Sequence, residues 1–433
     1  MKFYDRETEM KILKRNRIQS ERGSVLTVIT GRRRIGKTEL IKKFEKDNVL
    51  YLFVPRVNET MLCRQLVNNA RTDLGLSLID SGRFHDIFEQ LMRYGEKNNF
   101  TFVIDEFQEL EGINRSIISS IQELWDEYAA RSKVNMIVSG SVQSMMIKIF
   151  EMNKEPLFGR ATSKLNLGPF SPSVLKEILK DHNPDYGKDD LLFLYSVTGG
   201  VPKYVELLMD SGSVTFEKML DNICSMDSYF LTDGKDLLIS EFGKDHGTYF
   251  SILQMIANGK NTLREINDLT GKDCGAYLDK MYKEYKMVRK NRPMFSKENS
   301  RDVRWQISDN YLRFYFRFIS NNISAVEFRR YDLLKEDIRE NYERYSGSVL
   351  EDYFKNKSAE EERFTSIGSY WDKKGQNEID MIILDDHRKK ATISEVKRNP
   401  KKADINDLIK KAETIRSLSE YEKEYRILSL DDM

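Results

Sequence analysis

A stretch of eight residues near the start of the chain limits the fold more than any other feature. It runs Gly31-Arg32-Arg33-Arg34-Ile35-Gly36-Lys37-Thr38 and fits the P-loop pattern G-x-x-x-x-G-K-[ST] at every fixed position. The apolar run at 25–29 predicts the strand that should precede such a loop, and a helix should begin near Lys37. Backbone N–H groups of the loop and the helix dipole would face a polyphosphate. We expect all eight residues to contact ATP, with Lys37 at the β- and γ-phosphates and the Thr38 hydroxyl on Mg²⁺.

A second apolar run, at residues 100–106, ends in two carboxylates. It reads F-T-F-V-I-D-E, has no helical period and is typical of a buried parallel strand. Ligands of open α/β sheets bind at the carboxyl ends of such strands. We expect Asp105 to bind Mg²⁺ through water and Glu106 to orient or deprotonate the attacking water. The combination of both motifs favours a nucleotide site over an ordinary glycine-containing loop.

Composition narrows the class of protein. The chain has 433 residues, and its 70 Lys and Arg residues balance 69 Asp and Glu residues, so the overall charge does not indicate a nucleic-acid partner. No apolar run approaches the length of a membrane span and the start lacks a signal-peptide core, so we expect no membrane association and a cytoplasmic location. Cys63, Cys224 and Cys274 lie far apart, which disfavours a disulfide framework and structural zinc.

Four motifs together resemble one known family. They are F-x-x-R-E-x-E-x-x-x-L at residues 3–13, the arginine-rich P-loop, V-I-D-E-F-Q at 103–108 and I-V-S-G-S at 137–141. They resemble the AAA+-related archaeal-type ATPases, which are close to the STAND group. The resemblance implies that residues 4–6 lie near the adenine. It also implies that Ser139 or Ser141 senses the γ-phosphate, and we choose Ser141 as the contact; for either serine alone, an ordinary strand end is an equal alternative.

Two further segments acquire a role from this resemblance. Residues 157–161 are similar to a family segment whose arginine completes the ATP site, which makes Arg160 a catalytic candidate acting on a neighbour's γ-phosphate. A structural salt bridge explains Arg160 equally well. The T-G-G-V-P turn at 198–202 is similar to an element that contacts the nucleotide from the lid, so Pro202 is a candidate contact. As a sequence, this turn is simply a fixed corner between helices.

The middle of the chain changes to helical patterns from about residue 171. Residues 247–309 read as three helices followed by a hairpin, the pattern of a winged helix. Between 283 and 304 there are eight basic and three acidic residues, a local excess of +5. A basic wing can lie along DNA phosphates. A purely structural lid module is an equal alternative. The aromatic run at 311–318 predicts a core helix that joins domains.

The last hundred residues carry a second group of charged side chains. Glu351 lies beside the apolar face of a predicted helix, Asp380 lies near the start of a predicted strand, and Glu395 and Lys397 lie in the following strand. The strand period of two places Glu395 and Lys397 on one face, and a hairpin of this length brings Asp380 alongside.

This second group resembles the PD-(D/E)xK restriction-endonuclease-like fold, although Ile379 stands where that motif usually has proline. The resemblance implies Asp380, Glu395 and the helix-borne Glu351 as metal ligands, and Lys397 as the group that positions water. One or two Mg²⁺ ions would polarise a phosphodiester and lower the pKa of the attacking water. Related domains bind without cutting, so activity does not follow from the fold.

The predicted fold class is α/β, with a P-loop NTPase parallel sheet, a helical lid, a winged helix and a C-terminal α/β restriction-endonuclease-like domain. The expected domains are a P-loop ATPase core at 1–170, a helical lid at 171–240, a winged helix at 241–310, a helical connector at 311–340 and a nuclease-like domain at 341–433.

We expect an ATP-hydrolysing, Mg²⁺-dependent switch protein that acts on nucleic acid, DNA in particular, through these modules. The alternative is a signalling or scaffold ATPase whose C-terminal nuclease fold is inactive and used for binding. Assembly with further copies of the chain or with a partner protein stays open.

Overall fold

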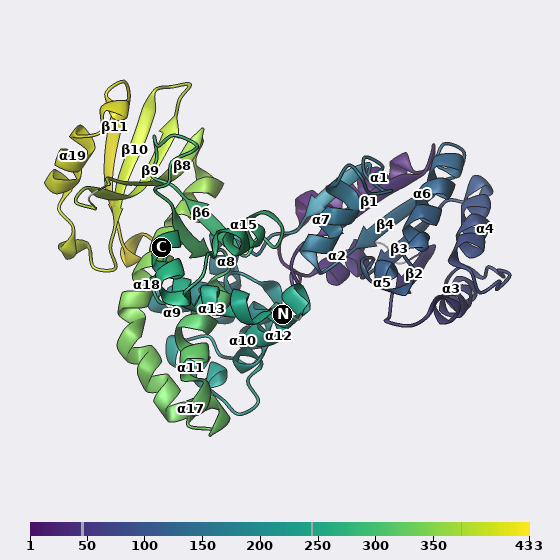
Figure 1. The fold of residues 1–433 in the computed structure, drawn as a ribbon, viewed down its shortest axis with the longest axis horizontal. Coiled ribbons are helices and arrows are strands. Elements are labelled where there is room, and N and C mark those ends of the chain that lie inside the picture. Colours follow the sequence, from purple (N-terminus) through teal and green to yellow (C-terminus); the bar gives the residue numbers. More distant parts are fainter. Residues whose placement is uncertain (45–46, 244–245, 374) are drawn as a thin grey trace. The chain divides into compact units, whose positions relative to one another are not determined.

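The computed structural model describes residues 1–44, 47–243, 246–373 and 375–433 (Figure 1). The chain forms two compact units, one of Asp5–Gly168 and one of Met1–Tyr4 with Pro169–Met433. The finer domain divisions stay predictions, and one 31-residue helix, α18 (Tyr331–Glu361), runs through residue 340, where we ended the connector. No helix in the described part is both long and apolar enough to cross a membrane.

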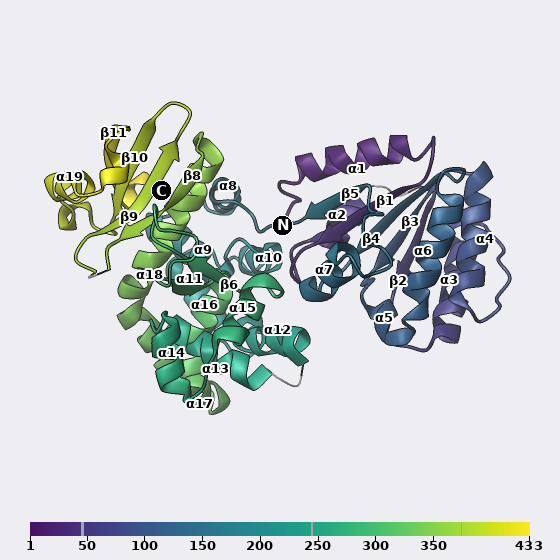
Figure 2. The same ribbon diagram turned by 45° about the horizontal axis from the view of Figure 1, so that its top comes forward.

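The unit Asp5–Gly168 is built on a five-stranded parallel sheet, which confirms the predicted P-loop NTPase class. Its strand order is β2-β3-β4-β1-β5 and can be followed in Figure 2. The strands are β1 Val25–Thr30, β2 Val49–Phe53, β3 Phe100–Asp105, β4 Val134–Ser139 and β5 Ser163–Asn166. Every residue of β3 and β4 is buried, as the continuous apolar runs predict for strands covered on both faces.

Helices cover this sheet and complete its core. They are α1 Glu7–Gln19, α2 Lys37–Phe44, α3 Glu59–Leu74, α4 Phe84–Lys97, α5 Glu109–Ile113, α6 Ser116–Tyr128 and α7 Gln143–Glu151. The side chains of α3, α4, α6 and α7 form one apolar cluster with alternate residues of β1 to β4. Because α2 begins directly after the loop that follows β1, the fold holds the P-loop at the carboxyl end of a central strand.

The second unit begins with helices packed around α9. These helices are α8 Pro172–His182, α9 Lys188–Thr198, α10 Pro202–Asp210, α11 Phe216–Ile223 and α12 Asp233–Phe242. Every residue from 191 to 198 is buried, as expected for a helix that is apolar on all sides. Helix α9 contacts α8, α10, α11 and α18, so it is the centre of this part of the core.

Three helices and a hairpin follow in the predicted order. They are α13 His246–Ala257, α14 Leu263–Thr270, α15 Gly275–Lys283, β6 Val288–Asn291 and β7 Arg304–Ile307. A capping box between Thr262 and Glu265 fixes the start of α14. Strands β6 and β7 pair antiparallel, with Val288 opposite Ile307. Their identification as a winged helix stays a prediction.

The aromatic segment after β7 is a buried connector, but its backbone is not one regular helix. Helix α16 (Asn310–Phe314) continues into a π-helical turn, Tyr315–Ile319, and a short helix, α17 (Ile323–Glu327), precedes α18. All the aromatic side chains of 311–318 are at most 2% exposed. Burial on this scale supports the predicted core role.

A four-stranded mixed sheet ends the chain, in the order β11-β10-β9-β8. Its elements are β8 Ser366–Trp371, β9 Glu378–Asp385, β10 Lys390–Val396, α19 Ile405–Glu413 and β11 Glu422–Leu428. Strands β8, β9 and β10 pair antiparallel, whereas β11 runs parallel to β10. Apolar side chains of β9 and β10 pack against α19, and α18 contacts β8, β9 and β10. Helix α18, which carries Glu351, therefore packs against the strands β9 and β10 that carry Asp380 and Glu395.

Candidate functional site

The P-loop is held in shape by a glycine and a buried lysine. Gly31 has a φ of 145°, and a Cβ at this position would lie 2.7 Å from the Leu167 carbonyl oxygen, so only glycine fits. Lys37 is 6% exposed, and its Nζ donates to the carbonyl oxygens of Gly31 at 2.8 Å and Arg32 at 3.0 Å. The ammonium is therefore held over the loop whose backbone N–H groups are expected to bind phosphate.

Asp105, at the end of β3, is the centre of a buried polar network. Its Oδ2 accepts hydrogen bonds from Thr38 Oγ1 at 2.8 Å and from the Tyr51 hydroxyl at 2.6 Å, and its Oδ1 accepts one from Ser139. Burial, followed by the hydrogen bond to Asp105, raises the pKa of Tyr51, so this hydroxyl stays a donor at neutral pH. The Thr38 and Asp105 oxygens are the hard ligands that Mg²⁺ prefers, so the two residues fit a magnesium ion at the P-loop.

Glu106 follows Asp105 and is also fixed in orientation. Its φ of 57° is unusual for a residue with a side chain and turns the chain directly after the strand. Its Oε2 accepts hydrogen bonds from Ser141 Oγ at 2.7 Å and from Gln108 Nε2. Ser139 and Ser141 thus each bond to one of the two acids, and the sensor role that we gave to Ser141 stays a prediction.

Sequence reasoning missed Tyr51 and gave Arg6 only a place near the adenine, which was implied by the family resemblance. Tyr51 lies in the middle of an apolar strand, and its contact with Asp105 depends on the register of β2 against β3, which the sequence does not reveal. Arg6 is 5% exposed and donates to the carbonyl oxygens of Gly168 at 2.7 Å and Ile35 at 3.4 Å. Arg6 therefore contacts the P-loop at the Ile35 carbonyl oxygen.

The structure gives Arg160 the salt bridge that the sequence left as an alternative. Its guanidinium donates to both carboxylate oxygens of Asp126, at 2.8 and 2.6 Å, and to the Pro156 carbonyl oxygen at 2.7 Å. These contacts raise the pKa of Arg160, mainly through the hydrogen bonds to Asp126. A catalytic role for Arg160 stays a prediction.

Pro202 begins α10 directly after a rigid corner. Gly200, with a φ of 76°, lies so close to Phe170 that an added Cβ would be 2.2 Å from its carbonyl oxygen, and Phe170 N donates to Gly200 O at 2.7 Å. The corner is therefore built by backbone contacts. Pro202 and the P-loop belong to different units, so its nucleotide contact stays a prediction.

At the C-terminal sheet, two carboxylates share one ammonium. Lys397 Nζ lies 3.0 Å from Asp380 Oδ2 and 2.8 Å from Glu395 Oε1, and Val396 N donates to the same Asp380 oxygen at 2.9 Å. Burial works against the charge of Lys397, but the bonds to Glu395 and Asp380 outweigh it and raise its pKa. Lys411 Nζ lies 3.5 Å from the second oxygen of Glu395. The strand period of two thus brings these side chains together.

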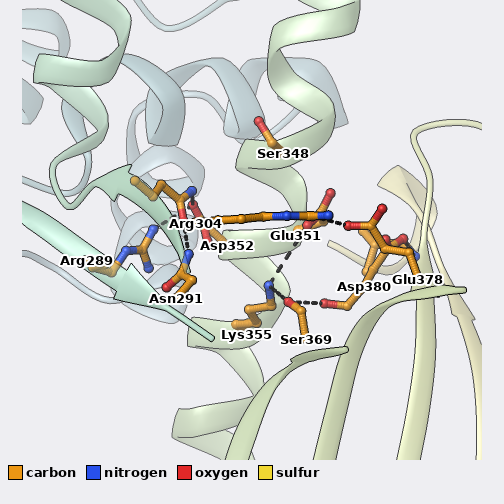
Figure 3. Close-up of polar contacts among 12 residues, drawn as sticks. Arg289, Asn291, Arg304, Ser348, Glu351, Asp352, Lys355, Ser369, Glu378 and Asp380 are labelled. Carbon is orange, nitrogen blue, oxygen red and sulfur yellow. Dashed lines mark hydrogen bonds and ion pairs between the residues drawn. The ribbon is translucent and has the colours of Figure 1, made fainter. Parts of the chain in front are cut away.

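Glu351 approaches this group from α18. Burial, followed by the charge of Asp380, raises the pKa of the Glu351 carboxyl above its usual range. Lys355 lies 3.9 Å from Glu351 and donates to Ser369 Oγ at 2.7 Å, which in turn donates to the Asp380 carbonyl oxygen at 2.9 Å (Figure 3). A chain of polar contacts therefore joins the helix-borne acid to the strand that carries Asp380.

Within the described ranges, no group of three or more His, Cys, Asp or Glu side chains is arranged to hold a metal ion. The Asp380 and Glu395 oxygens nevertheless suit Mg²⁺ chemically, and both already bind one cation, the Lys397 ammonium. The metal-binding roles of Glu351, Asp380 and Glu395 stay predictions.

Comparison with known proteins agrees with the P-loop geometry. Residues 3–208 match a family described as an ATPase domain predominantly from Archaea. MJECL04, an uncharacterized protein of Methanocaldococcus jannaschii, is 31% identical over 452 residues, which cover 98% of this chain and 95% of the relative. The protein belongs to the archaeal-type P-loop ATPase family. This archaeal-type ATPase also matches, at residues 315–408, a family described as archaea bacterial proteins of unknown function.

Two solved structures are similar to this chain, and one of them has a TM-score above 0.5. The Walker-type ATPase PABY2304 of Pyrococcus abyssi has a TM-score of 0.53 and 19% identity, over 73% of this chain and 96% of its own. The ORC2 protein of Aeropyrum pernix, solved as ADPNP-ADP complexes, has a TM-score of 0.47 and 16% identity, over 76% of this chain and 96% of its own. The family match identifies the protein as an ATP-binding P-loop ATPase.

Proposed function

We propose that this archaeal-type ATPase is an ATP-driven switch that acts on DNA, and that Asp380, Glu395 and Lys397 form a Mg²⁺-dependent nuclease site. The observation that carries the proposal is the convergence of both carboxylates on the Lys397 ammonium, at 3.0 and 2.8 Å. Two acids and a lysine at neighbouring strands are suited to phosphodiester hydrolysis, because the acids can hold a cation while the lysine orients water.

At the P-loop, each group has one task in ATP hydrolysis. Lys37 binds the β- and γ-phosphates after leaving the carbonyl oxygens of its own loop. Thr38 and Asp105 hold Mg²⁺, which neutralises phosphate charge when it is bound. Glu106, oriented by the Ser141 hydroxyl 2.7 Å away, accepts a hydrogen bond from the attacking water or takes its proton. Hydrolysis then changes the state of the nucleotide to which the rest of the chain responds.

At the C-terminal sheet, Asp380, Glu395 and Glu351 are the residues that would hold Mg²⁺, and a bound ion would polarise the phosphodiester. Lys397 is the only one of the four candidate residues with a positive charge, so it orients the water and offsets charge on the phosphate. Basic residues that follow Lys397 favour a polyanionic substrate; they are Arg398, Lys401 and Lys402. Arg388, Lys389 and Lys390 lie at the other end of the β9–β10 hairpin, where Lys390 is opposite Asp385, so they do not adjoin the candidate site.

The proposal of DNA binding also rests on the proposed winged helix, in which ion pairs within the unit neutralise part of the basic charge. Four of the eight basic residues between 283 and 304 form ion pairs with acids of the same unit: Lys283, Arg289, Lys290 and Arg304. The other four, Lys286, Arg292, Lys297 and Arg301, are the ones we propose for phosphate contacts. Such contacts would make DNA affinity fall steeply with added salt.

A cleavage assay tests the proposed nuclease site. Supercoiled plasmid and single-stranded DNA are incubated with Mg²⁺ and wild type, Asp380→Ala or Asp407→Ala. Asp407 is the matched control, because it is an exposed acid on α19 whose partner, Lys410, is a surface residue of the same helix. We expect cutting by wild type and Asp407→Ala and none by Asp380→Ala. No cutting by any protein would reject the nuclease and leave the scaffold ATPase with an inactive fold.

A further inference from the structure

A polar cavity of about 540 Å³ lies inside the second unit, beside the candidate nuclease residues. Its walls come from the end of α13, the β6–β7 hairpin, the α16 region, α18 and the strands β8 and β9. Its volume is in the range of about 300–1,000 Å³ that is usual for small-molecule sites. Of the residues that line it, Glu351 alone has a role in the proposed cleavage, and none has a role in ATP hydrolysis.

The side chains that line the cavity carry more positive than negative charge. Five are basic and three are acidic, namely Arg304, Arg313, Arg317, Arg344 and Lys355 against Glu351, Asp352 and Glu378. All three acids have basic neighbours: Arg304 lies 2.5 Å from Glu378, Arg313 lies 2.9 Å from Asp352, and Lys355 is 3.9 Å from Glu351.

Two of the arginines remain available for a ligand. Among the described residues, neither Arg317 nor Arg344 has a carboxylate within ion-pair distance. Arg317 comes from the π-helical turn and Arg344 from α18, so the two guanidiniums reach the cavity from different elements. Arginine is the side chain best suited to phosphate, because its planar fork donates two parallel hydrogen bonds.

The rest of the lining offers hydrogen-bonding groups of the kind that read a nucleobase. Side-chain amides come from Asn261, Asn291 and Asn341. Tyr345 is 9% exposed, and its buried hydroxyl has no hydrogen-bond partner within the described part of the chain. Buried hydroxyls normally have a hydrogen-bond partner, so a ligand that bonds to the Tyr345 hydroxyl would supply the partner that it lacks.

The cavity continues to the strand that bears Asp380. Glu351, Lys355 and Ser369 all line it, and Ser369 Oγ bonds to the Asp380 carbonyl oxygen (Figure 3). A ligand in the cavity would therefore lie beside the proposed metal ligands rather than at a separate surface.

We propose that this cavity binds one nucleotide unit, with its phosphate on Arg317 and Arg344 and its base among the amides and Tyr345. The unit is either a free nucleotide or the end of a nucleic-acid strand, which share this chemistry. Its position next to Asp380 would make it a substrate or product subsite, and only that assignment rests on the proposed nuclease function.

Calorimetric titration of the full chain tests the site. Lys37→Ala serves as the background, so that binding at the P-loop does not interfere. The probes are thymidine 5′-monophosphate, thymidine, and a 5′-phosphorylated hexathymidylate. Arg317→Ala and Arg344→Ala are compared with Arg339→Ala. Arg339 lies on α18, as Arg344 does, but it pairs with Glu217 outside the cavity. Arg344→Gln keeps the bulk of the side chain and guards against misfolding.

We expect at least one phosphorylated probe to bind, and each of the two cavity variants to lose about tenfold or more in affinity, as for the loss of one charged hydrogen bond. Arg339→Ala should bind like the background, and thymidine should bind far more weakly. Binding of the monophosphate would indicate a free nucleotide, and binding of the hexanucleotide alone would indicate a strand end.

The proposal is overturned if neither phosphorylated probe binds, or if both probes bind equally well to Arg317→Ala, Arg344→Ala and Arg344→Gln. Its failure is distinct from that of the nuclease proposal. A protein that never cuts DNA but binds nucleotide through Arg317 and Arg344 would retain the cavity site and lose only the nuclease.

Discussion

Asp352 is a buried carboxylate that joins the hairpin, the connector and α18. Its Oδ2 accepts hydrogen bonds from Arg289 of β6 at 2.9 Å, Gln306 of β7 at 2.8 Å and Arg313 of α16 at 2.9 Å. The Asp352 side chain is 6% exposed and that of Arg313 is 12% exposed. Asp352→Asn should therefore leave the Arg313 charge buried without its counter-charge.

The expected loss follows from these contacts. Removing one partner of a buried ion pair costs about 3–5 kcal/mol in the free energy of unfolding. Arg289 is 38% exposed and can turn to water, so we place Asp352→Asn at the lower end, about 3 kcal/mol. Glu343→Gln is the control on the same helix: Glu343 is 70% exposed and 3.6 Å from Lys402, and its loss should be under about 1 kcal/mol.

Urea denaturation followed by tryptophan fluorescence can measure this loss of stability in the unit that contains Asp352, Met1–Tyr4 with Pro169–Met433. Of the three tryptophans, only Trp125 lies in the unit Asp5–Gly168, so Trp125→Phe leaves Trp305 and Trp371 as reporters of the other unit. A loss in Asp352→Asn no larger than that in Glu343→Gln would refute the reasoning.

The pH dependence checks the same pair independently. Burial alone would raise the pKa of Asp352, but the charges of Arg289 and Arg313 outweigh it and lower the pKa. A carboxyl whose pKa is lower in the folded state contributes stability above its unfolded pKa of about 3.9 and loses that contribution as the pH falls through the folded value. The difference between wild type and Asp352→Asn should thus be constant above about pH 5 and shrink in stronger acid; a difference that grows in acid would contradict the argument.

Three further outcomes concern the ATPase. Tyr51→Phe removes one hydrogen bond to Asp105 and should slow steady-state ATP hydrolysis about fivefold, corresponding to about 1 kcal/mol. An unchanged rate would show that Tyr51 has no part in ATP hydrolysis. Arg160→Ala and Asp126→Ala should lose equal stability in thermal unfolding and keep the ATPase rate, because the two residues form a salt bridge; a rate loss of about 1,000-fold in Arg160→Ala alone would instead establish an arginine finger. Chelation of divalent ions by EDTA should stop ATP hydrolysis, and added Mg²⁺ should restore it; hydrolysis that persists in EDTA would reject the metal roles of Thr38 and Asp105.

The sequence predicted the centre of the ATPase sheet because its central strands are covered on both faces. Such strands read as continuous apolar runs, so β1, β3 and β4 and the acids that end β3 were recognisable. The contact of Tyr51 with Asp105 was not, because it depends on the pairing of strands that lie 54 positions apart at these residues. Register between distant strands is a property of the packed sheet rather than of either strand alone.

The C-terminal site was predictable for a different reason. Asp380, Glu395 and Lys397 lie on two consecutive strands, where the period of two and a short turn determine which side chains meet. Strands β8 and β11 were missed because their positions are mostly half-exposed, which gives a weak apolar signal. A count of charges likewise could not reveal that Arg289 and Arg304 of the hairpin are paired with acids of α18 and β9.

In the proposed switch, the nucleotide state of the P-loop controls the C-terminal site. Single-turnover cleavage of supercoiled plasmid, with and without ATP, tests it in wild type, Lys37→Ala and Lys42→Ala. Lys42 is the control on the same helix, since its side chain is 62% exposed and 3.9 Å from Glu39. ATP should change the cleavage rate of wild type and Lys42→Ala and leave the rate of Lys37→Ala unchanged. Equal cleavage by all three proteins at every ATP concentration would contradict it.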